Sequence, residues 1–420
     1  MKRLLLLATT TGYQANEFRA AAGRMGVPIS IASDRCHVLE DPWRDGALAV
    51  RFEHPEESAR RIVEFARRTP IAGIAAIGDA PTVTAALACH RLGLEYNSSE
   101  AVEICRDKFR TRECMAQAGL HVPWYLRAAA GSRPESLAKK VPFPCVLKPL
   151  GLSASRGVIR ADDREGFAAA FRRIRLLLRS PEVRRTNPEA AKWIQVESFI
   201  PGREVAVEGL LTRGKLRVLA IFDKPDPLDG PYFEETIYVT PSQLPGATQR
   251  AIVECTERAV AAVDLRHGPL HAELRVNDEG AWLLEMAARP IGGLCARALR
   301  FGEQRMPLEE LILRHALGEA VESLAREPEA SSVMMIPIAR AGVYEGVEGV
   351  EEASRTPGVT GIEITAKLRQ KLVPLPEGAS YLGFIFARGA TPEVVEQALR
   401  QAHAKLRFAI SANLPVVTKA

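Results

Sequence analysis

The stretch Pro269–Gly293, PLHAELRVNDEGAWLLEMAARPIGG, decides the fold of this chain. Hydrophobic and polar residues alternate on both sides of the turn-forming residues Asn277–Gly280, a pattern that predicts two strands joined as a hairpin. A period of two places Glu273 and Arg275 on the same face of the first strand. The second strand returns Glu285 to the side of Glu273, so we expect two carboxylates to converge.

Converging carboxylates are typical of a site for a hard cation. Arg289 follows Glu285 by four positions and adds a guanidinium to the same region. Carboxylate oxygens suit magnesium, and a guanidinium offers a fork of donors to phosphate, so the stretch is compatible with a magnesium-bound polyphosphate. The alternative is a solvated hairpin with ordinary surface charges, and these residues alone do not decide between the two.

The composition is that of a soluble globular protein. The chain has 420 residues, 47% hydrophobic and 25% charged, which is enough for two or three domains with their own cores. The net charge of +5 is the small difference between 56 basic and 51 acidic residues. No basic block is interleaved with aromatic residues, so we expect no nucleic-acid partner.

The cysteines and the first residues indicate the compartment. Seven cysteines are scattered without C-x-x-C spacing, which predicts neither a zinc site nor a redox motif and fits reduced thiols in the cytoplasm. The apolar run Leu4–Ala8 is too short for a signal peptide and reads as a first buried strand. No segment approaches the length of a membrane span, so we expect a cytoplasmic protein without a membrane partner.

Residues 1–105 alternate between strand and helix patterns, which predicts a parallel, Rossmann-like layer. The chain lacks both G-x-G-x-x-G after the first strand and the G-x-x-x-x-G-K-[ST] motif, so this layer is not expected to bind a dinucleotide. Gly12 and Asp79 lie at the predicted carboxyl ends of strands, where they could contribute substrate contacts.

The middle of the chain carries further candidate elements. A helix is predicted from Asp107, and the short strand Phe143–Pro149 leads into the small-residue loop Gly151–Gly157 at a hairpin tip. Small residues let main-chain N–H groups approach an anion, although a plain turn is the alternative. Two more strands flank Pro201-Gly202, and residues 331–420 read as a separate α+β unit.

Taken in this order, D-K-x-x-x-R from Asp107, V-x-K-P from Val146, the small-residue loop, the strand end at Glu197 and the hairpin resemble the ATP-grasp superfamily of carboxylate–amine ligases. The resemblance covers nearly the whole chain and is closest to the L-amino-acid ligases, the group of the bacilysin-type dipeptide ligases. It implies an α/β and α+β architecture: a Rossmann-like pre-ATP-grasp domain (1–105), a small ATP-grasp subdomain (106–194), a large one (195–330) and a ligase C-terminal domain (331–420).

The resemblance also implies the ATP site. Lys108 and Lys148 would neutralise the phosphates, and the small-residue loop would cover them. The carboxylate of Glu197 and the main chain that follows would read the adenine edge, and Glu204 would bind the ribose. The residues implied in ATP binding are Lys108, Lys148, Ser153, Ser155, Gly157, Glu197, Ser198, Phe199, Ile200 and Glu204.

The chemistry is implied in the same way. Glu273 and Glu285 would bridge to the metal, and Arg289 would hold the transferring phosphate, with Lys148 as its catalytic partner. The residues implied in substrate binding are Glu235, Tyr238, Arg289, Gly292 and Gly293, of which Glu235 would bind the substrate amino group. Ala287 stands where many ATP-grasp enzymes have an asparagine, which puts a second magnesium ion in doubt.

The expected activity is that of a carbon–nitrogen ligase. It would join a carboxylate, expected to be an amino acid, to an amine through an acyl phosphate and release ADP and phosphate. ATP and Mg²⁺, with Mn²⁺ as an alternative, would be the cofactors, the partners would be small molecules, and a homodimer is left open. The rival readings are another ATP-grasp class, such as a bicarbonate-activating carboxylase, and a nucleotide-binding protein without ligase activity.

Overall fold

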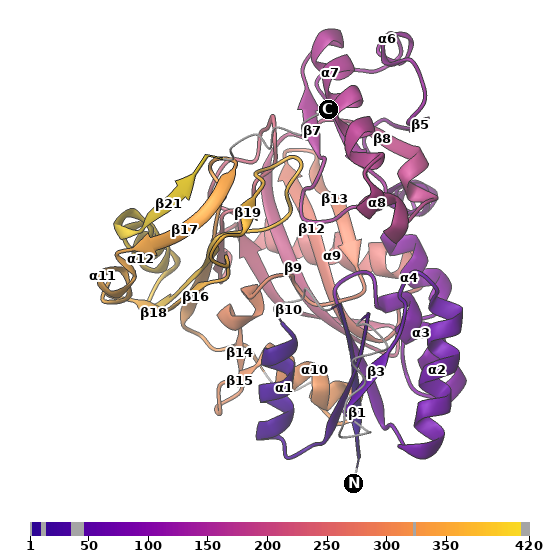
Figure 1. Cartoon of the computed structure of the whole chain (residues 1–420), viewed down its shortest axis with the longest axis vertical. Coiled ribbons are helices and arrows are strands. Elements are labelled where there is room, and N and C mark those ends of the chain that lie inside the picture. Colours follow the sequence, from indigo (N-terminus) through magenta and orange to yellow (C-terminus); the bar gives the residue numbers. More distant parts are fainter. Residues whose placement is uncertain (1, 10–13, 35–45, 322–324, 413–420) are drawn as a thin grey trace, which may run out of the picture.

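The computed structural model describes residues 2–9, 14–34, 46–321 and 325–412. These residues form five sheets, coloured from indigo to yellow along the chain in Figure 1, and the three largest carry the architecture. Within the described ranges, no helix is both long and apolar enough to cross a membrane.

The N-terminal part is a four-stranded parallel sheet in the order β3-β2-β1-β4, which confirms the Rossmann-like prediction. The run of leucines in β1 is buried because helices pack on both sides of a parallel sheet. The strands are β1 (Leu4–Ala8), β2 (Ile29–Ser33), β3 (Ala47–Ala49) and β4 (Gly73–Ile77), and the helices are α1 (Ala15–Arg24), α2 (Pro55–Arg68), α3 (Thr82–Leu92) and α4 (Ser99–Arg106).

A second, antiparallel sheet of four strands in the order β5-β8-β6-β7 forms the arm at the top of Figure 1. Its own core lies against the largest helix of this part, α7. The strands are β5 (Tyr125–Ala129), β6 (Cys145–Pro149), β7 (Ile159–Ala161) and β8 (Trp193–Ser198), and the helices are α5 (Lys108–Gln117), α6 (Pro134–Leu137), α7 (Arg164–Leu178), α8 (Pro181–Thr186) and η2 (Ala190–Lys192).

Two predictions can be compared with this arm. The loop Gly151–Gly157 joins β6 to β7, which pair antiparallel, so its predicted place at a hairpin tip is confirmed. The predicted subdomain boundary between residues 194 and 195 falls inside β8. Because β8 is hydrogen-bonded to both β5 and β6, the whole strand belongs to the arm.

The largest sheet has eight antiparallel strands in the order β13-β12-β9-β10-β11-β16-β20-β18. Its strands are β9 (Arg203–Thr212), β10 (Lys215–Asp223), β11 (Ile237–Thr240), β12 (Gly268–Asn277), β13 (Gly280–Ala287), β16 (Ala330–Ile336), β18 (Val359–Ile364) and β20 (Gly383–Gly389). The predicted hairpin is β12 and β13, and Glu273 pairs directly with Glu285.

The C-terminal strands continue this sheet. β11 pairs with β16, so main-chain hydrogen bonds cross the predicted boundary between residues 330 and 331. The remaining elements are α9 (Gly246–Ala262), η3 (Cys295–Ala298), β14 (Arg300–Phe301), β15 (Met306–Pro307), α10 (Leu308–Ala316), β17 (Gly342–Glu348), α11 (Val350–Ser354), β19 (Lys371–Leu372), α12 (Pro392–Lys405) and β21 (Arg407–Ser411). α12 begins with a side-chain cap, because the hydroxyl of Thr391 accepts from the N–H of Val394.

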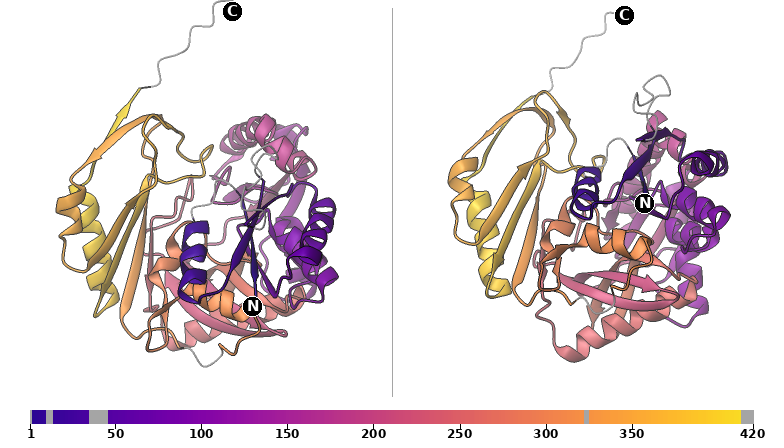
Figure 2. Two further views of the ribbon diagram at one scale, coloured as in Figure 1. Left: turned by 60° about the horizontal axis from the view of Figure 1, so that its bottom comes forward. Right: turned by 90° about the horizontal axis from the view of Figure 1, so that it is seen from below.

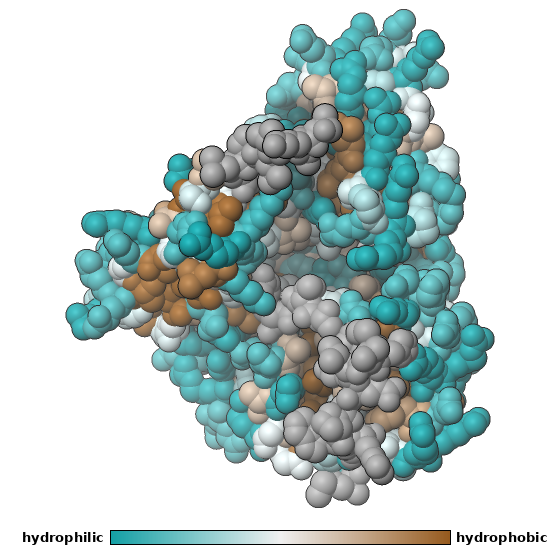
Figure 3. Space-filling model, in the orientation of Figure 1, coloured by the Kyte–Doolittle hydropathy of each residue, from teal (hydrophilic) through white to brown (hydrophobic). Residues whose placement is uncertain are grey.

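The two faces of the large sheet are covered by different parts of the chain. Figure 2 shows α12 on the outer face of the C-terminal strands and α1 on the other side. One apolar cluster joins Leu6 and Phe18 of the N-terminal part to Phe222, Met335 and Phe384 of the sheet. The space-filling view of Figure 3 shows a largely hydrophilic recess between the arm, the N-terminal part and the C-terminal strands.

Candidate active site

Two adjoining cavities lie where these parts meet. The first has among its lining residues most of those predicted for ATP and metal: Lys108, Lys148, Ser153, Ser155, Glu197, Ser198, Phe199, Ile200, Glu204, Glu273 and Glu285. It is also lined by Glu235 and Arg289, which were predicted to bind the substrate. The second, with a volume of about 490 Å³, shares several of these and adds Tyr238, Gly292 and Gly293. Gly157 lines neither cavity.

The hairpin places both predicted metal ligands at the first cavity. The pairing shifts by one residue next to Glu273, because β13 has an extra residue at this point. Such a bulge turns neighbouring side chains towards the same side, and both Leu284 and Glu285 line the cavity. Glu285 is 35% exposed and has a long contact of 3.3 Å to Lys108. Its oxygens are therefore accessible to a cation.

Glu273 is held from both sides by long contacts. Its Oε1 lies 3.4 Å from Nε2 of His271, and its Oε2 lies 3.8 Å from Nζ of Lys224. Burial opposes ionisation, but Lys224 and His271 outweigh it and hold the pKa of Glu273 well below its usual range. Glu273 and Glu285 thus place carboxylate oxygens side by side, a set of ligands that fits Mg²⁺.

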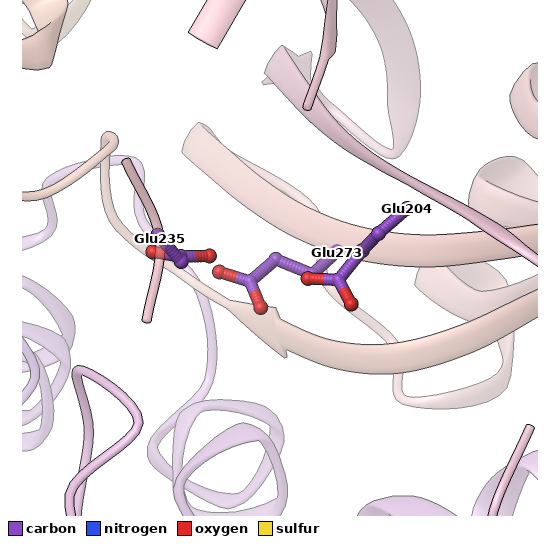
Figure 4. Close-up of side chains that lie close together, drawn as sticks. All are labelled: Glu204, Glu235 and Glu273. Carbon is purple, nitrogen blue, oxygen red and sulfur yellow. The ribbon is translucent and has the colours of Figure 1, made fainter. Parts of the chain in front are cut away.

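A buried lysine lies among three acids beside this pair. Carboxylate oxygens of Glu204, Glu235 and Glu273 lie within 4.8 Å of one another (Figure 4), an arrangement that could by itself hold a metal ion. Nζ of Lys224 is 2.8 Å from Glu204, contacts Glu235 directly and lies 3.8 Å from Glu273. The side chain of Lys224 is 2% exposed. The ammonium group of Lys224 therefore already offsets part of the negative charge of this cluster.

Glu235 responds to this arrangement in the opposite direction to Glu273. Burial and the negative charge of Glu273 raise the pKa of Glu235 to about 7, against the opposing effect of Lys224. Lys224 also lies 5.0 Å from the ring centroid of Tyr238, which is buried on β11. The predicted substrate-binding pair Glu235 and Tyr238 is thus assembled around the lysine.

Glu197 forms a second buried ion cluster at the end of β8. Its Oε1 accepts from Nε of Arg112 at 2.8 Å, and its Oε2 accepts from Nζ of Lys148 at 2.6 Å. Burial would raise the pKa of Glu197, but Arg112 and Lys148 lower it to about 2. The carboxylate fixes the position of the predicted catalytic lysine, and the expected contact of Glu197 with adenine stays a prediction.

The segment after Glu197 is held by its neighbours. The N–H groups of Ser198 and Phe199 donate to carbonyls of Trp124 and Pro144, at 2.8 and 2.9 Å. The ring of Phe199 lies between the guanidinium groups of Arg160 and Arg275, 4.2 and 4.9 Å from its centroid.

The next peptide of this segment differs from the two before it. Among the described residues, the N–H of Ile200 has no main-chain or side-chain acceptor. A free N–H beside the cavity is a donor that an adenine edge could use.

Arg289 is fixed by the N-terminal part. Its Nε and Nη2 donate to Oδ1 and Oδ2 of Asp79 at 2.7 and 3.2 Å, a bidentate pair. Asp79 follows β4, as predicted for a contributor from a strand end, whereas Gly12 lies outside the described residues. A guanidinium oriented in this way still has donors for a phosphate oxygen.

The loop Gly151–Gly157 is attached to the site and to the C-terminal strands. Nζ of Lys108 donates to the carbonyl of Leu152 at 2.8 Å. The N–H of Gly157 donates to the carbonyl of Pro376, also at 2.8 Å, so this group is not directed at a phosphate as predicted. A Cβ on Gly157 would lie 2.6 Å from Pro149, which gives the glycine a packing role instead.

Comparisons with known proteins agree with this geometry. Residues 141–298 match the ATP-grasp domain, and residues 334–411 match the L-amino acid ligase C-terminal domain 2. The crystal structure of an L-amino acid ligase from Bacillus licheniformis superposes with a TM-score of 0.83 at 25% identity, covering 98% of this chain and 99% of the other. The chain thus contains an ATP-grasp domain and an L-amino acid ligase C-terminal domain.

Two further comparisons cover less of the chain or share less of its sequence. The alanine–anticapsin ligase of Bacillus subtilis is 28% identical over 57% of this chain, and the match spans 56% of that ligase. An ATP-complexed carboxyaminoimidazole ribonucleotide synthase has a TM-score of 0.69 at 16% identity and shares the fold.

The candidate site includes residues that sequence reasoning missed. Lys224, Arg112 and Glu208 were not singled out, and His271 was quoted without a role. Nδ1 of His271 lies 2.5 Å from Glu208, and despite burial this acid raises the pKa of His271 to about 9. The period-two alternation of β12, which puts His271 on the same face as Glu273, was the available signal.

Proposed function

We propose that the chain is an ATP-dependent ligase that joins the carboxylate of an amino acid to an amine through an acyl phosphate. A carboxylate is a poor electrophile, and phosphorylation gives it a leaving group. A carboxylate oxygen attacks the γ-phosphorus and the bond to ADP breaks. The amine nitrogen then attacks the acyl carbon, phosphate leaves, and the nitrogen loses a proton. Positioning and charge neutralisation supply most of such catalysis.

The metal would be Mg²⁺ held by Glu273 and Glu285. When bound, it would supply positive charge that stabilises the transferring phosphate. Glu285 contributes accessible oxygens, and Glu273 contributes a carboxylate kept ionised by Lys224 and His271. Manganese has the same preference for oxygen ligands and would serve as a substitute.

The nucleotide would lie along the first cavity. Lys108 and Lys148 would contact the phosphates, with Ser153 and Ser155 of the small-residue loop above them. Both lysines start from fixed positions, because Lys108 is bound to the carbonyl of Leu152 and Lys148 to Glu197. Preorganised cations of this kind need little rearrangement when the phosphates arrive.

The nucleoside end would contact the segment after β8. Ile200 would offer its N–H to adenine, and Glu204 would accept from the ribose hydroxyls. Glu204 keeps acceptor capacity for this role, since its oxygens accept one bond each from Lys224 at 2.8 Å and Arg275 at 3.0 Å.

The substrates would occupy the second cavity beside Glu235, Tyr238 and Arg289. Arg289, oriented by Asp79, would stabilise the transferring phosphate. Glu235 would pair with a substrate ammonium while Lys224 anchors its other oxygen. A Cβ on Gly292 would meet nothing within 4 Å, so this position leaves the cavity open.

The observation that carries the proposal is the direct pairing of Glu273 with Glu285 at a cavity that also holds Lys108, Lys148 and Arg289. A screen of amino-acid pairs with ATP and Mg²⁺ tests it, with phosphate release as the signal and mass spectrometry of the product. We expect ADP, phosphate and an amide, with formation of all three dependent on both substrates. ATP turnover that is the same with and without every carboxylate and amine would contradict the proposal.

A further inference from the structure

Arg106 differs from the other cationic residues around the two cavities. It is the last residue of α4 and lines the second cavity. In the described part of the chain, no hydrogen bond or ion pair involves its guanidinium. The other cations are paired: Lys108 with Glu285, Lys148 with Glu197, Arg156 with Glu182, Arg275 with Glu204, and Arg289 with Asp79.

The backbone around Arg106 is fixed. Asp107 ends α4 and caps α5, where its side chain accepts from the N–H groups of Phe109 and Arg110 at 2.9 and 3.1 Å. The guanidinium is therefore presented from a rigid junction between two helices. A rigid position favours specific binding, because little conformational entropy is lost when a ligand arrives.

The charge of Arg106 is only partly compensated. Burial lowers the pKa of Arg106, while attraction to Asp79 acts in the opposite direction. Asp79 cannot serve as a full partner, because Arg289 engages both of its oxygens. A half-buried guanidinium without a hydrogen-bonding partner gains from an anion, and a carboxylate matches its fork of donors.

Arg106 lies on the side of the second cavity that the first cavity does not share. Lys108 and Arg289 line both cavities, whereas Arg106 lines only the second. Its companions there include Tyr238, Gly293 and Tyr381, which belong to the substrate side. A volume of about 490 Å³ holds an amino acid comfortably.

We propose that Arg106 binds the carboxylate of the amine substrate, so that the acceptor is an amino acid or another amino carboxylate. This inference rests on the proposed function. The donor carboxylate must reach the γ-phosphate beside Arg289, whereas the acceptor carboxylate must be kept away from it. A separate guanidinium in the second cavity meets that requirement.

Two nucleophiles that differ in one carboxylate test the inference. Aminooxyacetate and O-methylhydroxylamine both attack acyl phosphates through an uncharged nitrogen, and only the first carries a carboxylate. The donor is the amino acid that gives the most hydroxamate with hydroxylamine in the unmodified protein. We expect Arg106→Gln to lower kcat/KM for aminooxyacetate by roughly 10- to 100-fold, because the variant loses a charge-assisted hydrogen bond to the carboxylate. Rates with O-methylhydroxylamine and with hydroxylamine should stay within about twofold.

Arg110→Gln is the matched control. Arg110 lies four positions further on and pairs with Glu100 at the surface, and it lines neither cavity. Both nucleophiles should react with this variant as with the unmodified protein. Equal losses with both nucleophiles in Arg106→Gln would overturn the inference, and so would no loss with either. Failure of the unmodified protein to form hydroxamate with any donor would instead overturn the proposed function.

Discussion

Replacement of Lys224 by methionine tests whether an internal ammonium holds the site together. Methionine keeps much of the length and removes the charge, leaving Glu204, Glu235 and Glu273 with oxygens within 4.8 Å of one another. Two unit charges about 4 Å apart interact by about 4 kcal/mol at an effective dielectric constant near 20. Removing one partner of a buried ion pair costs about 3–5 kcal/mol. We therefore expect the free energy of unfolding to fall by about 3–5 kcal/mol.

Urea denaturation measures this change. The Lys224→Met variant should unfold at a lower urea concentration, while the dependence of its free energy of unfolding on urea concentration stays similar. Lys192→Met is the matched control, since Lys192 lies 2.6 Å from Glu189 but the two side chains are 59% and 77% exposed. That surface pair should contribute less than about 1 kcal/mol. Because the freed acids form a set of oxygen ligands, Mg²⁺ should restore part of the loss in Lys224→Met. A loss no larger than that of Lys192→Met would refute the reasoning.

Three further predictions concern catalysis and pH. Glu285→Gln keeps the shape and removes a metal-binding charge, so magnesium-dependent ATP turnover should fall by about a hundredfold or more, and near-normal turnover would exclude this acid from the mechanism. In steady-state kinetics, Glu204→Ala should raise the KM for ATP with little change in kcat, whereas Lys148→Ala should raise the KM and lower kcat. Unchanged kinetic constants in the two variants would contradict the assigned contacts. The pKa of Glu197, about 2 in the folded state against its usual 4.5, means that its stabilisation is present above pH 4.5 and is lost as the pH falls towards 2. The free energy of unfolding of Glu197→Gln should therefore be lower at pH 7 by on the order of 3 kcal/mol. Denaturation curves should show this difference between the two proteins becoming smaller below pH 4.5. A difference that stays constant with pH would count against the ion cluster.

The hairpin could be predicted because its signals are local. Alternation of residue type, a four-residue turn and a period of two fix which side chains share a face, and Glu273 does pair with Glu285. The bulge next to Glu273 could not be predicted in the same way. It depends on how β13 fits the curvature of a sheet whose strands come from distant parts of the chain.

The buried ion clusters show what local patterns do not reveal. Lys224 directly follows β10, 49 residues before Glu273, and the two meet only because β9 lies between β10 and β12 in the sheet. Arg112 was quoted as the end of a motif, yet its contact with Glu197 requires α5 to pack beside the arm. Such contacts follow from the order of the strands, which hydrophobic periodicity does not specify.

The division of the chain was also only partly predictable. A change of pattern near residue 331 suggested a separate unit, but strand composition does not tell which edge a strand joins. β11 pairs antiparallel with β16, so the large sheet continues into the C-terminal part. The boundaries of the predicted domains remain predictions about independent folding, which sheet topology alone does not decide.

Oxygen-18 transfer is the most direct test of the acyl phosphate mechanism. The donor amino acid that supports hydroxamate formation is labelled with ¹⁸O in its carboxylate and incubated with ATP, Mg²⁺ and an amine acceptor. Attack of the carboxylate on the γ-phosphorus transfers one labelled oxygen to inorganic phosphate when the amine displaces it, so we expect labelled phosphate together with unlabelled ADP. Labelled AMP with pyrophosphate would show attack at the α-phosphorus and would contradict the positions assigned to Arg289 and the two metal-binding acids.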